Sequence, residues 1–323
     1  MLVASRKRTP SRPVRRSGNP AKPKVTAAPQ KLAPVTARDW IGAARLRTLP
    51  LAISPVLVGT GAAMVIDGLF HWVLALCCLV VAVALQIGVN FANDYSDGIR
   101  GTDDHRVGPA RLTASGRVKP RAVLTAALIF FGIAALVGVA VVIRTQHWWM
   151  LLVGAVCIVA AWFYTGGKRP YGYAGLGELF VFVFFGLVAT TGTTFVQVGA
   201  VPWESWLAAI AVGFLACGVL VTNNLRDIAQ DKVAGKRTLS VLIGRRGSQV
   251  LYTVLMLLPF VIAALIAQFY PIAWLSLLVL LATLSATLIV WTYRTPRELI
   301  VALQLSSLAS VGYSAFLLWA YIG

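Results

Sequence analysis

Apolar runs of about twenty residues recur along most of this chain and constrain its fold more than any other feature. A helix of that length is long enough to cross the hydrocarbon core of a bilayer. Nine such runs follow Trp40, and 58% of the 323 residues are hydrophobic while only 12% are charged. Soluble domains are nearer half apolar and a quarter charged. The sequence therefore predicts an all-α polytopic membrane protein with nine transmembrane helices.

Two prolines mark the first predicted span. Pro50 and Pro55 interrupt its apolar run, and we expect this span to be kinked because proline removes a helical hydrogen bond. The nine predicted spans lie near residues 43–66, 70–93, 121–143, 147–165, 177–198, 204–224, 249–269, 271–292 and 299–322.

Basic residues alternate between the two sides of this predicted bundle. All 29 Lys and Arg except Arg144 lie in the N-terminal region through Arg47 or in the loops after the second, fourth, sixth and eighth spans. Positively charged loops face the cytoplasm, so the N-terminus is predicted inside and the C-terminus outside. Membrane orientation thus explains the net charge of +18. Nucleic-acid binding would instead need that charge on a folded face with stacking aromatics.

The N-terminal region differs in composition from the rest of the chain. Residues 1–38 hold ten Lys or Arg, repeated Pro and Ala, and no acidic residue before Asp39. They contain no apolar core of signal-peptide length. We interpret residues 1–38 as a disordered basic cytoplasmic tail that lies on anionic lipid, with an organellar transit peptide as the alternative. Residues 39–323 form the predicted transmembrane domain.

Carboxylates are concentrated in two stretches, which follow the second and sixth predicted spans directly. Ionisable groups beside membrane spans are costly and usually mark a site. Magnesium typically joins one or two carboxylates to a substrate phosphate. The sequence therefore predicts a site for a metal-bound, phosphorylated substrate. The whole chain has 11 Asp and Glu, and six lie in these stretches: Asp94, Asp97, Asp103, Asp104, Asp227 and Asp231.

The spacing within each stretch places oxygen donors on one helical face. Residues four apart are neighbours on a helix surface, which aligns Asn93 with Asp97, and Asn223 with Asp227 and Asp231. Two such columns facing each other would hold Mg²⁺ around a diphosphate, and the metal would neutralise the leaving group. The alternative is that these acids cap helix ends or pair with nearby arginines. Two matched columns in a chain so poor in acid favour the site.

Basic residues in the following loops fit an anion site. Arg111 lies in Gly-Pro-Ala-Arg-Leu-Thr-Ala-Ser-Gly, and Lys236 and Arg237 lie in Gly-Lys-Arg-Thr-Leu. Small residues allow such loops to fold over an anion, and guanidinium binds phosphate through two hydrogen bonds. Other basic residues of these loops are the ordinary signal for cytoplasmic orientation.

A third loop on the same side is rich in tyrosine. Its tyrosines, Tyr164, Tyr171 and Tyr173, would line a pocket for an allylic cation, because aromatic faces attract positive charge. Interfacial placement is the alternative for them. Glu178, at the start of the next apolar run, is either a helix N-terminal charge or an acid of the site.

Several of these motifs together resemble those of the UbiA-type intramembrane prenyltransferases. They are Asn93-Asp-Tyr-Ser-Asp97, Gly101-Thr-Asp103, Asn223-Asn-Leu-Arg-Asp227-x-x-x-Asp231 and Gly235-Lys-Arg-Thr-Leu239. Within that family the chain is most similar to the MenA-like branch, which prenylates 1,4-dihydroxy-2-naphthoate. Many members have a third acid where this chain has Gly101, and the later Asp103 is a variant of the naphthoate branch. The resemblance spans residues 40 to 323.

The resemblance implies a helical bundle around a central cavity that opens sideways to lipid and is capped by cytoplasmic loops. The implied Mg²⁺ ligands are Asp94, Asp97, Asp103, Asp227 and Asp231. The implied substrate-binding residues are Asn90, Asn93, Arg111, Lys168, Tyr171, Glu178, Asn223, Asn224, Arg226, Lys236 and Arg237. The implied catalytic residues are Asp97, Asp227, Lys236 and Tyr164. Tyr164, Tyr171 and Glu178 remain open as the base.

The implied reaction joins a polyprenyl diphosphate to an aromatic acid, with loss of diphosphate and CO₂, and yields demethylmenaquinol. The expected partners are these two substrates, Mg²⁺ and membrane lipid, without nucleic acid. The expected location is a bacterial cytoplasmic membrane, because the product is a respiratory quinone. The alternatives are a different acceptor, such as 4-hydroxybenzoate, haem or chlorophyllide, and more remotely an ion-coupled transporter. A transporter should have its acids on broken helices near the bilayer midplane.

Overall fold

The structure is a computed structural model that describes residues 34–102 and 111–323. Most of the predicted tail, and the predicted ligand Asp103, therefore lie outside the described residues. The described part is helical and contains no strand. Its elements are α1 (Ala37–Ala43), η1 (Leu46–Thr48), α2 (Pro50–Asp67), α3 (Trp72–Arg100), α4 (Pro120–Thr145), α5 (Met150–Phe163), η2 (Tyr171–Tyr173), α6 (Gly177–Val181), η3 (Phe182–Val188), α7 (Ala189–Val198), α8 (Trp203–Val233), α9 (Leu239–Ile266), η4 (Pro271–Val279), α10 (Leu280–Thr292) and α11 (Glu298–Ile322).

The helical stretches match the predicted spans in order. In the described ranges, eight of them are long and apolar enough to cross a membrane, and α5 is a shorter apolar helix at the position of the fourth predicted span. The first span differs from its prediction, because Pro50 starts α2 instead of interrupting it. Proline suits that position, where its missing N–H has no helical partner to lose. Helix α2 then continues through Pro55 to Asp67.

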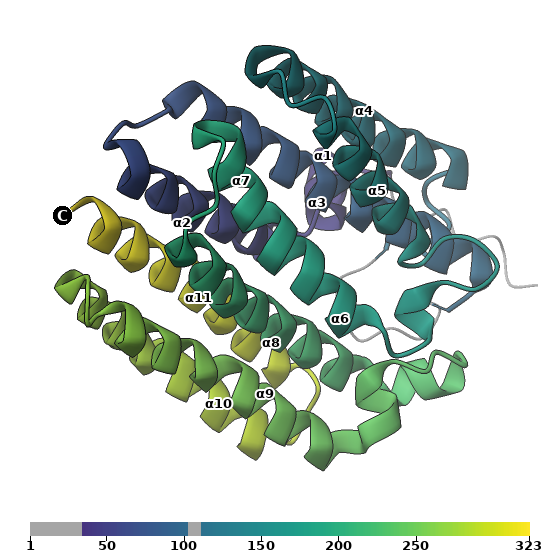
Figure 1. Cartoon of the computed structure of the whole chain (residues 1–323). Coiled ribbons are helices and arrows are strands. Elements are labelled where there is room, and N and C mark those ends of the chain that lie inside the picture. Colours follow the sequence, from purple (N-terminus) through teal and green to yellow (C-terminus); the bar gives the residue numbers. More distant parts are fainter. Residues whose placement is uncertain (1–33, 103–110) are drawn as a thin grey trace, which may run out of the picture. The chain divides into compact units, whose positions relative to one another are not determined.

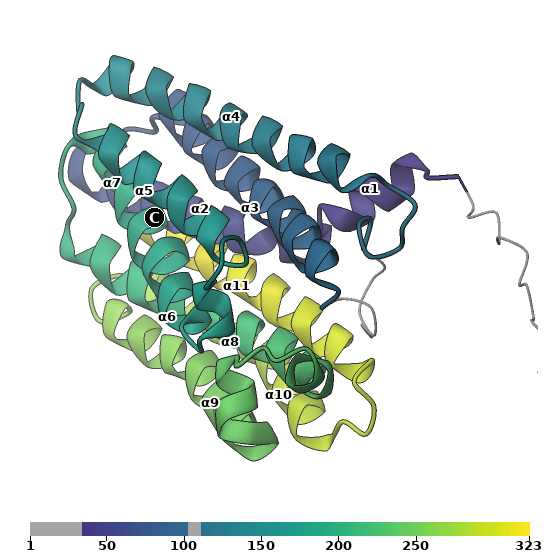
Figure 2. The same cartoon turned by 90° about the vertical axis from the view of Figure 1, so that its right-hand side faces the viewer.

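Helix α8 is the centre of the bundle. It packs against α9, α11, α2 and the α6–η3 segment, while α3 packs against α4 and α2, as Figures 1 and 2 show. The core around α8 includes Leu215 of that helix, Tyr252 and Met256 of α9, and Tyr313 of α11. Tyr252 is buried together with Ser306, and their hydroxyls are hydrogen-bonded at 2.7 Å. This pairing keeps a polar group satisfied where no water reaches it.

One glycine pair sets how closely α8 meets its neighbour. The segment η3 is a turn of π-helix within the span Gly177–Val198. A side-chain carbon on Gly186 of η3 would lie 2.5 Å from the Cα of Gly213 in α8. Small residues permit close helix contact inside membranes. The α6–η3–α7 span is thereby held against α8, and its first turn lies beside the Asn223–Asp231 motif of α8, where Asn224 is hydrogen-bonded to Glu178.

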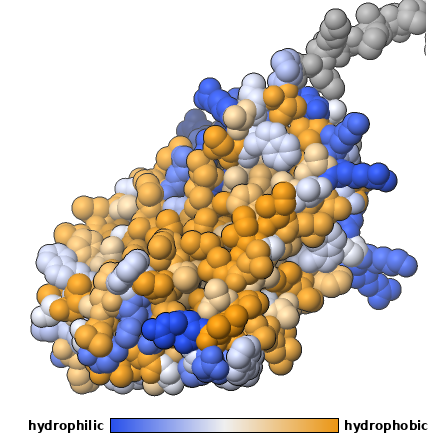
Figure 3. Space-filling view, turned by 90° about the horizontal axis from the view of Figure 1, so that it is seen from above, coloured by the Kyte–Doolittle hydropathy of each residue, from blue (hydrophilic) through white to orange (hydrophobic). Residues whose placement is uncertain are grey.

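The outside of the bundle is apolar. Leu136 of α4, Leu152 of α5 and Leu281 of α10 expose more than two thirds of their surface. Apolar side chains cover most of the face drawn in Figure 3, and hydrophilic side chains gather toward its edges. Such a surface suits contact with lipid hydrocarbon and not with water.

Candidate active site

Helices α3 and α8 both extend beyond their apolar runs, and their polar ends meet at one pocket. The pocket has a volume of about 60 Å³. Asn93 and Asp97 line it from the last turns of α3, and Asn223, Asp227 and Asp231 line it from α8. The two predicted columns of oxygen donors therefore share one chamber. The other described lining residues are Arg45, Thr102, Arg111, Tyr164, Thr165, Gly172, Tyr173, Asn224, Gln230, Lys236 and Thr238.

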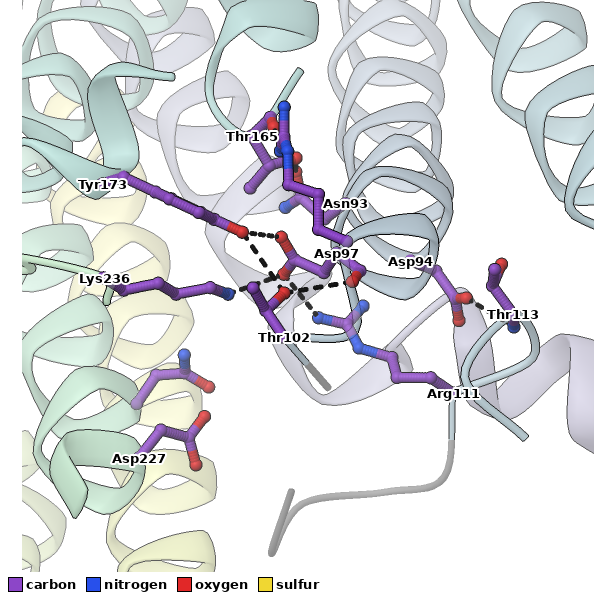
Figure 4. A network of polar contacts seen from close by, with 12 residues as sticks. Asn93, Asp94, Asp97, Thr102, Arg111, Thr113, Thr165, Tyr173, Asp227 and Lys236 are labelled. Carbon is purple, nitrogen blue, oxygen red and sulfur yellow. Dashed lines mark hydrogen bonds and ion pairs between the residues drawn. The ribbon is translucent and has the colours of Figure 1, made fainter. Parts of the chain in front are cut away.

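Asp97 contacts several side chains of this polar pocket (Figure 4). Its side chain is only 4% exposed. The Tyr173 hydroxyl donates a hydrogen bond to its Oδ1 at 2.5 Å, and the Lys236 ammonium donates to its Oδ2 at 2.9 Å. The Arg111 guanidinium lies 3.7 Å from the same Oδ2. These partners offset the cost of burying a carboxylate.

Asp94 points away from the pocket, although it precedes Asp97 by only three residues. One oxygen accepts the backbone N–H of Leu112 and the other accepts that of Thr113, both at 2.9 Å. The helix approaches this loop closely at Gly98, where a side-chain carbon would lie 2.4 Å from Thr113. Asp94 thus anchors the loop that carries Arg111. The structure does not bring it to the predicted metal position.

Asp227 and Asp231 occupy the opposite wall. Arg226 donates to both oxygens of Asp227, through Nε at 2.7 Å and Nη2 at 2.6 Å. The same Nη2 also donates to the amide oxygen of Asn223 at 2.9 Å. Arg226 thus contacts a predicted metal ligand in this structure. Asp231 holds the loop after α8, since its backbone carbonyl accepts the N–H of Lys236 at 2.8 Å.

The tyrosine-rich loop between α5 and α6 covers the polar pocket, and Arg100 of α3 is bonded to it. This guanidinium donates hydrogen bonds to the backbone carbonyls of Thr165 and Gly167. The Thr165 hydroxyl donates to the amide oxygen of Asn93 at 2.6 Å. The ring of Tyr173, in the same loop, lies between cations, with Arg100 5.6 Å and the Lys236 nitrogen 4.7 Å from its centroid. The loop is therefore attached to α3 at several points.

The three tyrosines of this loop are neutral phenols at physiological pH. Burial raises the pKa of Tyr164, Tyr171 and Tyr173 well above the usual value, and the charge of Asp97 raises that of Tyr173 further. The Tyr171 hydroxyl donates to the carbonyl of Ala160 at 2.8 Å, and its ring stacks on Phe180. These residues can donate hydrogen bonds, but their raised pKa values keep them protonated, so that no phenolate is available as a base near neutral pH.

A larger apolar cavity adjoins the polar pocket. It has a volume of about 490 Å³ and is lined mainly by apolar side chains from α2 to α8. Arg45, Asn93, Tyr164 and Asn223 line both chambers. A molecule with a charged head and a long apolar tail would place its head among the aspartates and its tail in the cavity. The two chambers thus match an amphipathic substrate.

Three predicted substrate-binding residues form hydrogen bonds within the protein, and Asn90 among them also lines the apolar cavity. The Asn90 amide donates to the carbonyl of Ala44 at 3.0 Å, which ties α3 to the segment before α2. The Asn224 amide donates to the buried carboxylate of Glu178 at 2.9 Å. Asn224 lines the polar pocket, whereas Glu178 lines neither chamber. Glu178 therefore orients a pocket residue in this structure.

Two predicted basic residues do not reach the pocket. Lys168 and Arg237 are exposed and are not among the residues that line either chamber. The backbone N–H of Arg237 instead donates to the carbonyl of Tyr173 at 3.0 Å. This bond joins the loop after α8 to the tyrosine loop.

The sequence analysis did not assign Arg45, Thr102 or Thr165 to the site, and it gave Tyr173 no role beyond the one shared by all tyrosines of its loop. Tyr173 lies in the tyrosine-rich loop that was singled out, but nothing local separates it from Tyr164 and Tyr171. Arg45 has a left-handed backbone conformation, with φ of 55°. That conformation is uncommon for a residue with a side chain and often occurs at functional sites. It is visible only in the structure.

The donor set of the pocket fits a hard divalent cation that is shared with a phosphate. Among the described residues, no group of three His, Cys, Asp or Glu side chains is close enough to enclose a metal. Mg²⁺ does not need such a cage, since it binds one or two carboxylates, substrate phosphates and water. Asp97 and Asp227 face one chamber from opposite walls, with Asn93 and Asn223 beside them. These oxygen donors match that preference.

Comparison with known proteins gives consistent results. The profile of the UbiA prenyltransferase family matches residues 52–317. The chain is 48% identical over 282 residues to 1,4-dihydroxy-2-naphthoate octaprenyltransferase of Mycobacterium tuberculosis, covering 87% of this chain and 94% of that protein. It is 41% identical over 211 residues to the enzyme of that name from Escherichia coli, covering 64% and 68%.

Solved structures share the fold. A UbiA homolog from Aeropyrum pernix K1 superposes with a TM-score of 0.65 at 17% identity, over 83% of this chain and 97% of that one. A UbiA homolog from Archaeoglobus fulgidus bound to GPP and Mg²⁺ gives 0.60 at 16% identity, over 88% and 99%. The predicted all-helical bundle and the predicted resemblance are both confirmed. The chain, a multi-pass membrane protein, belongs to the UbiA prenyltransferase family.

Proposed function

We propose that this protein transfers a polyprenyl group from polyprenyl diphosphate to 1,4-dihydroxy-2-naphthoate, with loss of CO₂ and diphosphate, and so forms demethylmenaquinol. The observation that carries this proposal is the continuity of the polar pocket with the apolar cavity, which share Asn93, Tyr164 and Asn223. The naphthoate as acceptor is supported by relatives of 48% and 41% identity that carry that activity in their names.

The polar pocket would bind the diphosphate. Lys236 and Arg111 lie beside Asp97 and would donate to phosphate oxygens, since charge-assisted hydrogen bonds of this kind are strong. Asp97, Asp227 and Asp231 would hold Mg²⁺, assisted by Asn93 and Asn223. Bound Mg²⁺ would supply neutralisation of the charge that develops on the leaving diphosphate. We assign no metal role to Asp94, whose two oxygens anchor the loop.

The acceptor ring would meet the allylic carbon where the two chambers join. The bond from that carbon to the diphosphate oxygen breaks, and the ring carbon that bears the carboxylate forms a new C–C bond. CO₂ then leaves and restores the aromatic ring. Tyr164 lies at this junction, and its raised pKa makes it a hydrogen-bond donor to the acceptor. Preorganised donors of this kind stabilise charge in a water-poor site.

The same residues support a proposal for the cellular placement. The ends of α3 and α8 that carry the aspartates are followed by basic loops, which we place on the cytoplasmic side by the positive-inside rule. We propose a bacterial cytoplasmic membrane, with the N-terminal tail in the cytoplasm and against lipid. The diphosphate would then enter from the inner leaflet.

An acceptor screen tests this function. Purified protein with Mg²⁺ and one radiolabelled polyprenyl diphosphate is incubated with 1,4-dihydroxy-2-naphthoate or 4-hydroxybenzoate, and lipid-soluble product and CO₂ are measured. We expect a prenylated quinone and CO₂ from the naphthoate alone. Product from 4-hydroxybenzoate in preference to naphthoate would assign the other acceptor class. Asp227→Ala should abolish the reaction in folded protein, and full activity of that variant would contradict the metal assignment.

A further inference from the structure

The central carboxylates of the polar pocket are already paired with the protein's own cations. Asp97 accepts the Lys236 ammonium at 2.9 Å and faces Arg111 at 3.7 Å. Asp227 is held by two hydrogen bonds from Arg226. Asp97 Oδ2 and both side-chain oxygens of Asp227 thus already accept hydrogen bonds from protein cations. The protein cations and a metal therefore compete for the same oxygens.

The carboxylates of the pocket are not in excess over the cations. Among the described residues that line it, the cationic side chains are Arg45, Arg111 and Lys236, and the carboxylates are Asp97, Asp227 and Asp231. Arg226 does not line the pocket but adds a further cation, bonded to Asp227. A divalent cation approaching alone meets no excess of negative charge there. Displacing a buried partner would also leave an unpaired charge in a poorly hydrated site, which is strongly unfavourable. The described geometry thus opposes metal binding in the absence of another anion.

A diphosphate removes this obstacle, because its oxygens are alternative acceptors for the displaced cations. Lys236 lies beyond the end of α8 at Val233, so its long side chain would change partners without rearranging that helix. The Tyr173 hydroxyl would remain on Asp97 Oδ1 and preserve the orientation of the carboxylate. The cations would then leave the carboxylates and bind the phosphate oxygens in a single exchange of partners.

We propose that Lys236 and Arg226 act as internal counter-ions that move from Asp97 and Asp227 to the diphosphate, so that metal and diphosphate bind cooperatively and the metal binds weakly alone. This inference rests on the proposed function, because it takes the diphosphate to occupy this pocket. Coupling of two ligands is reciprocal. The diphosphate must therefore strengthen metal binding by the same factor by which the metal strengthens diphosphate binding.

The test uses the full-length protein in detergent and needs no catalysis. Binding of Mn²⁺, as a paramagnetic substitute for Mg²⁺, is titrated by electron paramagnetic resonance. Binding of radiolabelled inorganic pyrophosphate is measured by equilibrium dialysis with and without Mg²⁺. In the wild type we expect weak Mn²⁺ binding alone, and pyrophosphate binding that Mg²⁺ strengthens by about tenfold, a typical coupling.

The variant Lys236→Met tests whether Lys236 takes part in the exchange or has only a structural role. We expect it to bind Mn²⁺ alone about tenfold more tightly than wild type, and to lose most of the effect of Mg²⁺ on pyrophosphate. Arg226→Met should likewise strengthen Mn²⁺ binding alone and reduce the effect of Mg²⁺ on pyrophosphate binding. With two variants, the proposal can still be tested if one of them fails to fold. Lys232→Met is the matched control, because Lys232 is an exposed lysine of α8 outside the pocket, and it should behave like wild type.

Two outcomes would overturn the proposal, and they differ. If both methionine variants fold but bind Mn²⁺ alone no more tightly than wild type, these cations do not hold the metal position. The exchange is then wrong while the proposed function stands. If the wild type binds no pyrophosphate even with Mg²⁺, the diphosphate site itself is wrong, and the proposed function fails together with the exchange.

Discussion

The phenol oxygen of Tyr173 lies 2.5 Å from Oδ1 of Asp97, so that the loop before α6 is bonded directly to the carboxylate at the end of α3. Burial and the charge of Asp97 raise the pKa of Tyr173, which keeps the hydroxyl protonated and able to donate. The loop therefore covers the polar pocket and also fixes the direction in which one of its aspartates points.

Tyr173→Phe should lower kcat for prenyl transfer by about 10- to 100-fold, the usual cost of losing a residue that orients a metal ligand. The ring remains to pack against Arg100 and Lys236, so the fold should be kept. The measurement is steady-state kinetics with Mg²⁺ titrated in parallel, because a misdirected Asp97 should also raise the Mg²⁺ requirement. Unchanged kcat and Mg²⁺ dependence would show that the bond is incidental.

The same residue predicts a pH dependence of stability. An unfolded tyrosine ionises near pH 10, and the folded-state pKa of Tyr173 is raised above that value. The contribution to the free energy of unfolding is therefore fully present below about pH 10 and is lost as pH rises from there toward the folded pKa. Thermal unfolding of wild type and Tyr173→Phe should differ by a constant amount from pH 7 to 9. The difference should shrink above about pH 10, and a change near neutral pH would contradict this assignment.

Asp94→Asn and Asp97→Asn should fail in different ways. An asparagine at 94 would turn an amide NH₂ toward the backbone N–H of Leu112 or Thr113, replacing an attraction with a clash of donors. We expect a loss of about 1–3 kcal/mol in the free energy of unfolding and partial activity. Asp97→Asn should instead remain folded and lose activity. Denaturant unfolding together with product formation distinguishes them. If Asp94→Asn were fully stable and lost as much activity as Asp97→Asn, Asp94 would have to be assigned to the metal site.

Gly138→Leu should obstruct the tail of the substrate. Gly138 of α4 lines the apolar cavity, and a side-chain carbon there would meet no atom within 4 Å. The added side chain would fill space that the prenyl tail needs, so KM should rise for long prenyl diphosphates more than for a five-carbon one. Gly132→Leu is the matched control, because Gly132 is on the same helix with equal space but does not line the cavity. Equal effects of both variants would exclude this position as part of the tail site.

Removal of divalent metal should stop turnover completely and reversibly. Among the described residues, the protein cations already satisfy Asp97 and Asp227, so chelation should leave the melting temperature without substrate nearly unchanged. The check is product formation in EDTA, followed by addition of excess Mg²⁺, with unfolding measured in the same buffers. Activity that persists in EDTA would contradict a metal-dependent departure of diphosphate.

Much of the fold was predictable because its signals are local. Run lengths of apolar residues gave the spans, and the structure has a helical stretch for each of them, with α5 the shortest. The start of α2 was misjudged, since Pro50 is compatible both with interrupting a helix and with beginning one. In the site, the four-residue spacing correctly placed Asn93 with Asp97 on one wall and Asn223 with Asp227 on the other.

The sequence by itself determined which residues share a helical face, because helical periodicity and hydrophobicity act between near neighbours. Only the tertiary structure decided which way each motif turns and what lies across from it. Asp94 faces a returning loop while Asp97 faces the pocket, and the hydroxyl on Asp97 comes from Tyr173, 76 positions along the chain. Such pairings depend on the rotation of packed helices and on the paths of the loops between them. Neither is encoded in the residues adjacent to the aspartates.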